Sequence, residues 1–317
     1  MKMPEQFDKV SLGLFPTPIH RLENLSRHLG TNVYIKRDDM TGLGLGGNKV
    51  RKLEYLLAEA RSQGAQVVFT TGGAQSNHAM LTAAAAARLG RKAILILKKR
   101  GVTACRGNQF LEKLMGTQVC FMDTDDYADI YAEMDRVGRS LGVPYYKIPC
   151  GGSNALGSMG YVACAREIAG QGIRFDHIVC AEGSGGTLAG LALGAKLFLP
   201  GARVHGMMVD TDPFEEITLR LMREAAALME TDVTPTSGDF HLRDLCGPGY
   251  AIPSEAGNAA VSLMAAQEGL FLDPVYTGKA FAGLIALARE GAFRPDDNVL
   301  FIHIGGAGGL FAVGQEG

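Results

Sequence analysis

The hydrophobic positions of this chain follow two alternating spacings. Short, almost continuous apolar runs such as 67–71, 93–97 and 177–180 are separated by longer segments in which apolar residues recur at helical spacing. Continuous apolar runs that alternate with amphipathic helical segments are typical of parallel sheets covered by helices on both faces. The pattern therefore predicts an α/β fold made of open, doubly wound parallel sheets.

Two alternating series follow one another, separated by a pair of glycines at 151–152. The first predicts strands at 33–35, 67–71, 93–97, 119–122 and 145–148, and helices near 22–29, 52–63, 77–89, 107–115 and 126–141. The second predicts helices at 155–169, 187–198, 213–229, 255–268 and 277–290, and strands at 177–180, 204–209 and 299–304. The polar segment 231–250 is expected to be a loop.

The glycine-rich segment 41–54 delivers one lysine, Lys49, to the start of the first long helix. The positive end of a helix dipole disfavours an ammonium group there and favours a neutral amine or an imine. Lys49 is therefore a candidate for covalent attachment to a carbonyl compound. A solvated lysine that follows a glycine turn is the alternative.

Two nucleotide-binding motifs come close to matching this segment, but neither fits. Gly42, Gly44 and Gly47 satisfy the dinucleotide pattern, yet the next strand ends in two glycines without the acidic residue that holds a ribose. A phosphate-binding Walker loop would place glycine directly before the lysine and Ser or Thr directly after it, where Asn48 and Val50 stand. We therefore expect neither a nicotinamide nor a nucleoside triphosphate here.

Composition narrows the class of protein. The 317 residues carry a net charge of −2 and form no long basic run, which argues against a nucleic-acid partner. The N-terminus lacks the apolar core of a signal peptide, and no charge-free apolar run approaches the roughly 20 residues of a membrane span. The six cysteines form no C-x-x-C pair, so we expect reduced thiols, no metal site and a cytoplasmic protein.

Loops that follow strands carry the chemistry in doubly wound folds. After strand 67–71, Ser76 and Asn77 stand at a helix N-terminus, where free N–H groups can hold a carboxylate, although an ordinary helix cap is the simpler interpretation. His78 is interpreted as a helix-start residue rather than a base. After strand 177–180, the small residues of 182–187 can curl into a concave run of N–H groups that suits a phosphate, with hydroxyls from Ser184 and Thr187.

The last glycine-rich loop, 302–309, offers no obvious catalytic side chain, so we expect its backbone to approach a flat ligand closely. A lysine suited to an imine, a separate phosphate site and a carboxylate-binding helix start together describe a site for pyridoxal phosphate and an amino acid. The cofactor acts as an electron sink in such enzymes.

Motifs in chain order resemble one family over nearly the whole length. They are the segments 16–18 (PTP), 35–39 (IKRDD), 46–54 (GGNKVRKLE), 75–78 (QSNH), 183–187 (GSGGT) and 273–279 (DPVYTGK). The chain resembles the D-cysteine desulfhydrase and 1-aminocyclopropane-1-carboxylate deaminase family of pyridoxal phosphate enzymes, which have the tryptophan-synthase-β-like fold (fold type II). The resemblance implies a large cofactor domain, 1–51 plus 155–317, a small α/β domain, 52–154, and a homodimer.

The resemblance also implies residue roles. Lys49 would form the imine with the cofactor and transfer protons, and Asn77 would bond the ring hydroxyl. Ser76 would hold the substrate carboxylate or move a proton, with Asn77, His78 and Tyr276 also near the substrate. Tyr250 and Tyr276 would be catalytic tyrosines, the alternative being aromatics packed in loops. Cofactor contacts are further implied for Lys52, Gly183, Ser184, Gly185, Gly186, Thr187 and Thr277.

Substrate choice turns on two positions. The resemblance implies that deaminase-like members carry Glu after the second tyrosine and Leu in the last glycine loop, where this chain has Thr277 and Ile304. A neutral Thr gives a weaker electron sink than a carboxylate, so we expect α,β-elimination of a D-cysteine-like amino acid to pyruvate, ammonia and sulfide. The alternatives are cyclopropane-carboxylate deamination and elimination from L-cysteate. Met80 and Leu81 replace the Arg and Gln of many relatives, which argues mildly against cysteate.

A protein that binds the cofactor without eliminating anything is a further alternative, and a nicotinamide-dependent dehydrogenase is the least favoured.

Overall fold

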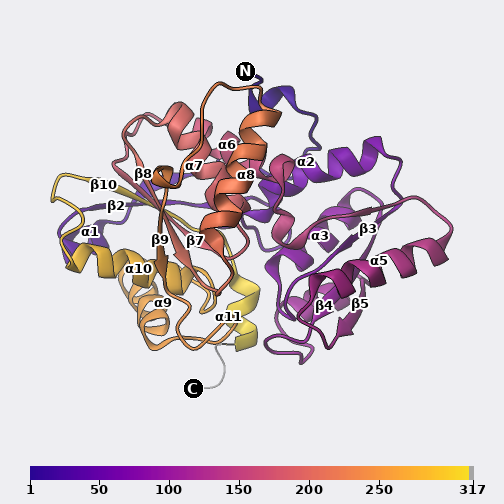
Figure 1. The fold of residues 1–317 in the computed structure, drawn as a ribbon. Helices are drawn as coiled ribbons and strands as arrows, with labels where there is room; N and C mark the ends of the chain where they lie inside the picture. The colour runs from indigo at the N-terminus through magenta and orange to yellow at the C-terminus, as the bar shows by residue number, and fades with distance from the viewer. Residues whose placement is uncertain (314–317) are drawn as a thin grey trace.

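The computed structural model describes residues 1–313 and arranges its strands in two sheets that lie side by side (Figure 1). The larger sheet has the order β1 (Ile19–Arg21), β2 (Asn32–Lys36), β10 (Asn298–Ile302), β7 (His177–Glu182), β8 (Arg203–Met208) and β9 (His241–Asp244). The smaller sheet has the order β5 (Gln118–Met122), β4 (Lys92–Lys98), β3 (Val67–Thr70) and β6 (Tyr145–Lys147). Neighbouring strands are parallel except β1, which runs antiparallel to β2 at the edge.

Helices cover both faces of the larger sheet, as Figure 1 shows. One face carries α6 (Ala155–Gly170), α7 (Gly186–Phe198) and α8 (Phe214–Leu228), and the other carries α1 (Glu23–Leu29), α9 (Glu255–Glu268) and α10 (Thr277–Arg289). Every residue of the central strand β7 is buried, which explains its uninterrupted apolar run.

The smaller sheet is also covered on both faces. Leu95 of β4 packs with Ala79 of α3 (Asn77–Arg88), next to α4 (Asn108–Leu114). Ile96 of the same strand packs on the opposite face with Ile130 and Met134 of α5 (Tyr127–Leu141). Helix α2 (Lys49–Ser62) packs against both α3 and α6 and so joins the two halves of the molecule. The predicted doubly wound arrangement is confirmed in both sheets.

Each sheet has one point at which the strand order reverses. In the larger sheet the chain moves from β7 outward to β8 and β9 and then returns to β10 on the other side of β7. In the smaller sheet it moves from β3 to β4 and β5 and returns to β6 beside β3. Ligands of doubly wound folds bind at the carboxyl ends of the strands at these points. The loops after β7, β10, β3 and β6 are therefore the ones that position a site.

Several predicted boundaries were wrong. Helix α2 begins at Lys49 rather than 52, and the segment 231–250 contains a short 3-10 turn, Ser237–Asp239, followed by β9. The sequence analysis also missed β1 and α11 (Ala307–Val313). β1 and β9 are short, partly exposed edge strands that carry polar residues, and α11 opens with Ala-Gly-Gly, in which glycines are poor helix formers. None of these elements has a strong periodic pattern.

We propose that the domain boundaries follow the two sheets, with residues 52–154 as the small domain. All strands of the smaller sheet fall inside that range, and all strands of the larger sheet fall outside it. The last four residues of the expected large domain lie outside the described part of the chain. Within residues 1–313, no helix is both long and apolar enough to cross a membrane.

Candidate active site

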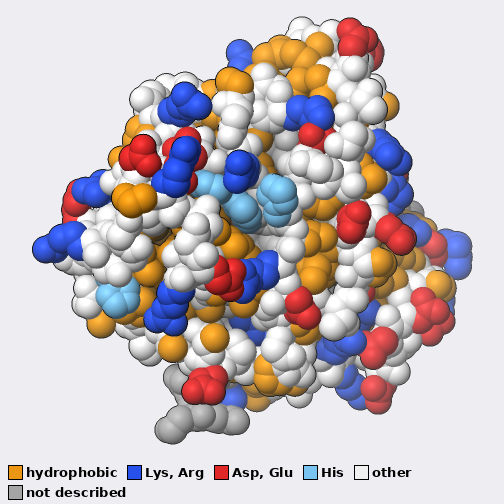
Figure 2. Space-filling model, turned by 60° about the vertical axis from the view of Figure 1, so that its left-hand side comes forward, with side chains coloured by type: hydrophobic (Ala, Val, Ile, Leu, Met, Phe, Trp, Pro, Cys, Tyr) orange, Lys and Arg blue, Asp and Glu red, His pale blue; other side chains and the backbone are white. Residues whose placement is uncertain are grey.

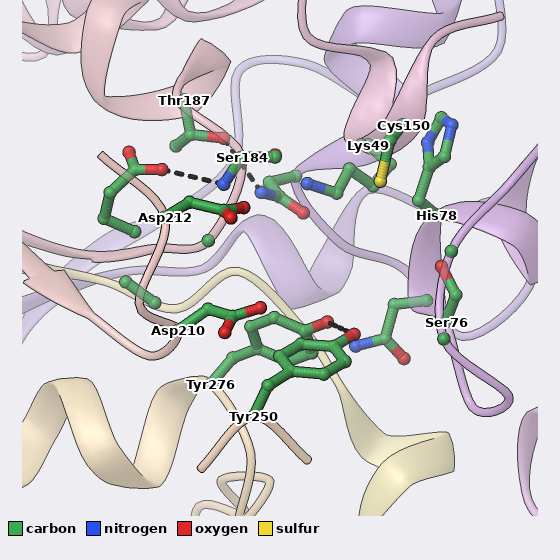
Figure 3. A pocket seen from close by; sticks show the side chains of 18 of the residues that line it. Lys49, Ser76, His78, Cys150, Ser184, Thr187, Asp210, Asp212, Tyr250 and Tyr276 are labelled. Carbon is green, nitrogen blue, oxygen red and sulfur yellow. Dashed lines mark hydrogen bonds between the residues drawn. The ribbon is translucent and has the colours of Figure 1, made fainter. Parts of the chain in front are cut away.

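A cavity is lined by the loops at the reversal points of the two sheets. Figure 3 shows the side chains that line it. Loops after β3 and β6 form one side, and loops after β7, β8 and β10 form the other. The predicted site residues that line this cavity are Lys49, Ser76, Asn77, His78, Gly183, Ser184, Thr187, Tyr250 and Tyr276. Lys52, Gly185, Gly186 and Thr277 do not line it in the described structure and lie behind its wall.

Close backbone contacts fix Lys49 at the first turn of α2. Asn48 N donates to Ile304 O at 3.1 Å, and a Cβ at Gly47 would stand 2.8 Å from the same oxygen. The last glycine loop therefore approaches the backbone of the lysine loop, whereas the sequence suggested a flat ligand. Burial lowers the pKa of Lys49, and within residues 1–313 no group accepts a hydrogen bond from its amine. This amine is available for an imine.

The loop after β7 carries residues 183–187, here called the N–H nest after the concave run of N–H groups that the sequence predicts there. Gly185 has φ +84°, a conformation that favours glycine, and Gly186 begins α7. Asn48 Nδ2 donates to Thr187 Oγ1 at 3.0 Å, which leaves the Thr187 hydroxyl hydrogen free to donate elsewhere. The nest therefore combines backbone and hydroxyl donors at a helix N-terminus.

Lys52 supports the N–H nest from behind. Its Nζ donates to Gly151 O and to Ser153 Oγ, both at 3.1 Å. A Cβ at Gly186 would lie 2.8 Å from Lys52 Nζ and 2.8 Å from Ser153 Oγ, so only glycine allows both groups to approach. Burial, and then the charge of Lys49, hold the pKa of Lys52 well below its usual range. An anion in the nest would stabilise the charged form of Lys52.

Ser76 and Asn77 stand at the start of α3, as predicted. Ser76 Oγ caps the helix by accepting from Ala79 N at 3.1 Å, so the ordinary cap coexists with a position in the cavity wall. Asn77 Oδ1 accepts from Asn108 Nδ2 at 2.7 Å, which turns the Asn77 amide donor away from Asn108. The sequence analysis missed Asn108, which follows no strand directly.

His78 is held as a neutral side chain. The Thr70 hydroxyl donates to Ile148 O, so His78 Nε2 is the donor in its 2.8 Å contact with Thr70 Oγ1. Burial, followed by the charges of Lys49 and Lys52, lowers the pKa of His78 well below its ordinary value. This geometry favours a wall residue over a base, as expected from the sequence.

Tyr250 and Tyr276 form a pair at the other end of the cavity (Figure 3). Their hydroxyl oxygens are 2.6 Å apart. Burial raises the pKa of Tyr250 to about 12 and raises that of Tyr276 well above its ordinary value. Both hydroxyls therefore keep their hydrogens at neutral pH. Both tyrosines line the cavity and contact each other, and their catalytic role stays a prediction.

Thr277 is turned toward Asp273. Its Oγ1 donates to Asp273 Oδ1 at 2.7 Å and accepts from Asp273 N at 2.7 Å. Burial raises the pKa of Asp273, although its hydrogen bonds with Thr277 favour the charged carboxylate. A cofactor contact for Thr277 stays a prediction, since its hydroxyl hydrogen already has an acceptor.

Charged residues at the cavity mouth were missed by the sequence analysis. Arg100 Nη1 lies 3.7 Å from Asp210 Oδ2, which links the segment after β4 with the segment after β8. Lys98 and Asp212 also line the cavity. All four stand at or just beyond the carboxyl ends of β4 and β8, so the rule that was applied to the glycine loops would have found them.

Met80 does not line the cavity and packs in the apolar core beside α2. The cationic side chains at the cavity mouth, Lys98 and Arg100, therefore come from the end of β4 and not from α3.

Cys150 also lines the cavity, and its Sγ lies 3.2 Å from the Tyr127 hydroxyl.

The donor set of this cavity fits pyridoxal phosphate. An unpaired lysine amine can form the imine, the N–H nest can accept the phosphate, and the Asn77 amide can bond a ring oxygen. Glycine at 186, where a Cβ would block Lys52, is consistent with a cradle that needs close approach.

Comparisons with known proteins agree with this geometry. A D-cysteine desulfhydrase from Salmonella newport is 43% identical over 318 residues, covering 97% of this chain and 96% of the relative. A Pyrococcus horikoshii protein provisionally named a 1-aminocyclopropane-1-carboxylate deaminase is 43% identical, covering 98% and 95%.

Solved structures give the same result. A crystal structure described as that of an ACC deaminase homologue superposes with a TM-score of 0.91 at 42% identity, covering 98% of this chain and 96% of the other. A tomato (Solanum lycopersicum) threonine deaminase, 19% identical with a TM-score of 0.65 over 92% of this chain and 79% of its own, shows the shared fold alone. The family described as "Pyridoxal-phosphate dependent enzyme" matches residues 10–305, and the chain belongs to that family.

Proposed function

We propose that this enzyme catalyses α,β-elimination of a D-cysteine-like amino acid. For D-cysteine the balanced reaction consumes one water and gives pyruvate, ammonia and hydrogen sulfide. The observation that carries the proposal is the position of an unpaired lysine amine in one cavity with a protonated tyrosine pair. The relative named a D-cysteine desulfhydrase supports it.

Each group has a task that its geometry allows. When bound, the cofactor supplies the electron sink for the carbanion at the substrate Cα. Lys49, with a pKa lowered by burial, would hold the cofactor and would take the proton from the substrate Cα. The first turn of α3, with Ser76 and Asn77, holds the substrate carboxylate through free N–H groups.

The tyrosine pair acts as the acid for the leaving group. One hydroxyl hydrogen is used in the bond between Tyr250 and Tyr276, and the other remains available. Because the pKa values of both phenols are raised, the pair holds this hydrogen over the whole neutral range. Its donation to the departing sulfur would avoid release of a free thiolate into a half-buried cavity.

Deamination of 1-aminocyclopropane-1-carboxylate is the second candidate. Ile304 lines the cavity at the position where the resemblance implies Leu in deaminases, and two relatives are named or described as deaminase-like. Elimination from L-cysteate is a third candidate, since Lys98 and Arg100 supply cations at the mouth for an anionic side chain.

Assembly and location are part of the same proposal. We expect a homodimer, because Phe110 and Leu114 of α4 and Phe311 of the adjacent α11 are 49%, 67% and 60% exposed. A cytoplasmic location is supported by six cysteines that are all free thiols.

One assay distinguishes the candidates. The purified holoenzyme is incubated separately with D-cysteine, L-cysteine, L-cysteate and 1-aminocyclopropane-1-carboxylate, while the absorption spectrum, sulfide, sulfite, pyruvate and 2-oxobutyrate are followed. We expect sulfide and pyruvate from D-cysteine alone. Release of 2-oxobutyrate would establish the deaminase instead, and sulfite the cysteate lyase. Lys49→Ala should abolish every product, whereas the exposed Lys92→Ala should not.

A spectral change on adding substrate, with no keto acid from any compound, would overturn the proposal and leave a cofactor-binding protein without elimination activity.

A further inference from the structure

Glu182 is a buried carboxylate inside the proposed phosphate site. It ends strand β7 at 1% exposure and lines the cavity. Its Oε1 accepts from Ser184 N at 2.8 Å and from Gly185 N at 2.5 Å. Its Oε2 is buried and has no hydrogen-bond partner within the described residues. The side chain therefore uses two donors of the N–H nest and leaves one oxygen unsatisfied.

This arrangement puts a resident anion where another anion is expected to bind. The N–H groups of Ser184 and Gly185 point at one concave site at the start of α7, and two acceptors cannot share the same hydrogen at full strength. A phosphate in the nest would also lie beside the almost fully buried carboxylate of Glu182. The repulsion between two neighbouring negative charges in a buried site strongly disfavours a state in which both the phosphate and the carboxylate are fully ionised.

The surroundings of Glu182 allow it to become neutral. Lys49 and Lys52 face it from α2, and Cys180 lies two residues earlier on its own strand. From α8 the side chains against Gly185 are the apolar Ile217 and Leu221. Burial raises the pKa of Glu182, although the N–H groups of Gly185 and Ser184 and the charge of Lys52 favour its charged form.

We propose that Glu182 competes with the cofactor phosphate for the N–H nest, so that phosphate binding displaces its carboxylate from Ser184 N and Gly185 N and takes up one proton. The residue thereby tunes cofactor affinity and makes it depend on pH. The inference rests on family membership and on the geometry of the loop, and it holds whichever amino acid is the substrate.

The test measures cofactor retention by the holoenzyme. Equilibrium dialysis against graded pyridoxal phosphate gives the apparent Kd between pH 6 and pH 9 for the parent enzyme and for Glu182→Gln, whose amide oxygen can still accept from the nest. If cofactor binding takes up one proton, the parent enzyme should retain the cofactor more weakly as the pH rises. The change should reach about tenfold per pH unit relative to the variant. We expect Glu182→Gln to bind pyridoxal phosphate tighter at high pH and to lose this extra pH dependence.

Two comparisons make the result specific to phosphate. Pyridoxal, which lacks the phosphate, should bind the parent enzyme and Glu182→Gln equally. Glu112→Gln is the matched control, because Glu112 is also fully buried with unpartnered oxygens but does not line the cavity. Glu112→Gln should leave the pH dependence of retention unchanged.

Equal Kd values for the parent enzyme and Glu182→Gln at every pH would overturn the proposal. A loss of affinity in Glu182→Gln that is the same for pyridoxal phosphate and pyridoxal would also overturn it, since it would show a structural role. Glu182→Ala gives the same comparison by a second route, with tighter phosphate-dependent binding expected.

Discussion

Tyr250 Oη and Tyr276 Oη are 2.6 Å apart, although the two residues are 26 positions apart in the sequence. Tyr276 stands at the start of α10, and Tyr250 lies in the loop before α9. Tyr250 also crosses to the other side of the cavity, where a Cβ at Gly73 would lie 3.0 Å from its ring. The pair therefore joins the two sides of the cavity, and its two hydroxyls are bonded to each other.

We predict that Tyr250→Phe and Tyr276→Phe each lower kcat/KM for elimination by about 100-fold, in the usual range for loss of a positioned acid. Each substitution removes one hydroxyl of the pair. The remaining hydroxyl then has no partner to orient it while it donates its proton to the leaving group. The double variant should be no worse than the poorer single variant, because both changes break the same unit. Initial rates of pyruvate release measure all three.

Multiplicative losses in the double variant would contradict this account and indicate two independent roles. Cofactor absorbance should stay unchanged in all three variants, which separates catalysis from cofactor loss.

Gly186→Ala is predicted to weaken cofactor retention by about tenfold or more. The added Cβ would lie 2.8 Å from Lys52 Nζ and 2.8 Å from Ser153 Oγ, so the groups behind the N–H nest must move away. Dialysis of the holoenzyme against buffer, followed by absorbance, measures the loss. Gly170→Ala at the end of α6 is the control, because nothing lies within 4 Å of its added Cβ. Equal retention in both variants would refute the packing argument.

The elements and residues that line the cavity could largely be predicted from the sequence. Strand-to-helix loops with Lys49, Ser76 and Ser184 were found because local patterns mark both the strand that ends and the helix that begins. The carboxyl ends of parallel strands then bring these loops together. The tyrosines depended on the family resemblance, since no local pattern distinguishes a catalytic tyrosine from a packed one.

Side-chain direction could not be predicted. Glu182 belongs to the predicted phosphate loop, but only the structure shows that its carboxylate turns back into the nest. Thr277 was expected beside the cofactor ring, yet its hydroxyl is bonded to Asp273. Both outcomes depend on competition among neighbouring donors and acceptors in three dimensions, which residue spacing does not encode.

The geometry of Thr277 changes the expected effect of Thr277→Glu. A glutamate there was expected to strengthen the electron sink, but the site is fully buried and already holds the Asp273 carboxylate. A second carboxylate beside the first should lower the free energy of unfolding by about 3 kcal/mol. Urea unfolding measures this loss, with Thr277→Val as the uncharged control. An unchanged urea midpoint would show that the new carboxylate reaches the cavity instead.

A buried ion cluster is centred on Arg51, two residues after Lys49. Arg51 Nε and Nη2 each lie 2.8 Å from a carboxylate oxygen of Asp38, and Tyr161 donates to Asp38 at 2.6 Å. Arg51 also contacts Glu167 of α6. The cluster therefore ties the 3-10 turn Asp38–Met40, which follows β2, to α2 and α6 just behind Lys49.

Asp38→Asn is predicted to lower the free energy of unfolding by about 3–5 kcal/mol, because it leaves Arg51 buried without its main counterion. Burial opposes the charged form of Asp38, but Arg51 outweighs it and lowers the pKa. The stabilisation is present above the unfolded-state pKa and is lost as pH falls through the lower folded value. Urea titrations at pH 7 test the size of the loss, and a loss below 1 kcal/mol would contradict it.

Acid sensitivity is predicted to arise in part from a histidine cluster on the larger sheet. Histidine side chains gather in the middle of one face (Figure 2), where His177 Nδ1 lies 2.9 Å from His205 Nε2 and His241 packs beside His205. Burial, then the nearby charges of His177, His241 and Arg203, lowers the pKa of His205 to about 3.

The sign of the effect follows from proton binding. Above pH 6.5 His205 is neutral in both states and contributes nothing to the pH dependence, whereas between about 6.5 and 3 only the unfolded state binds the proton. As the pH is lowered through that window, the free energy of unfolding should therefore fall by up to about 1.4 kcal/mol per pH unit. In urea titrations between pH 7 and pH 4, His205→Gln should reduce the pH dependence of the free energy of unfolding by the equivalent of up to one bound proton. His28→Gln, at an exposed position, should leave it unchanged. Equal slopes for the parent enzyme and His205→Gln would show that His205 takes up its proton in the folded state.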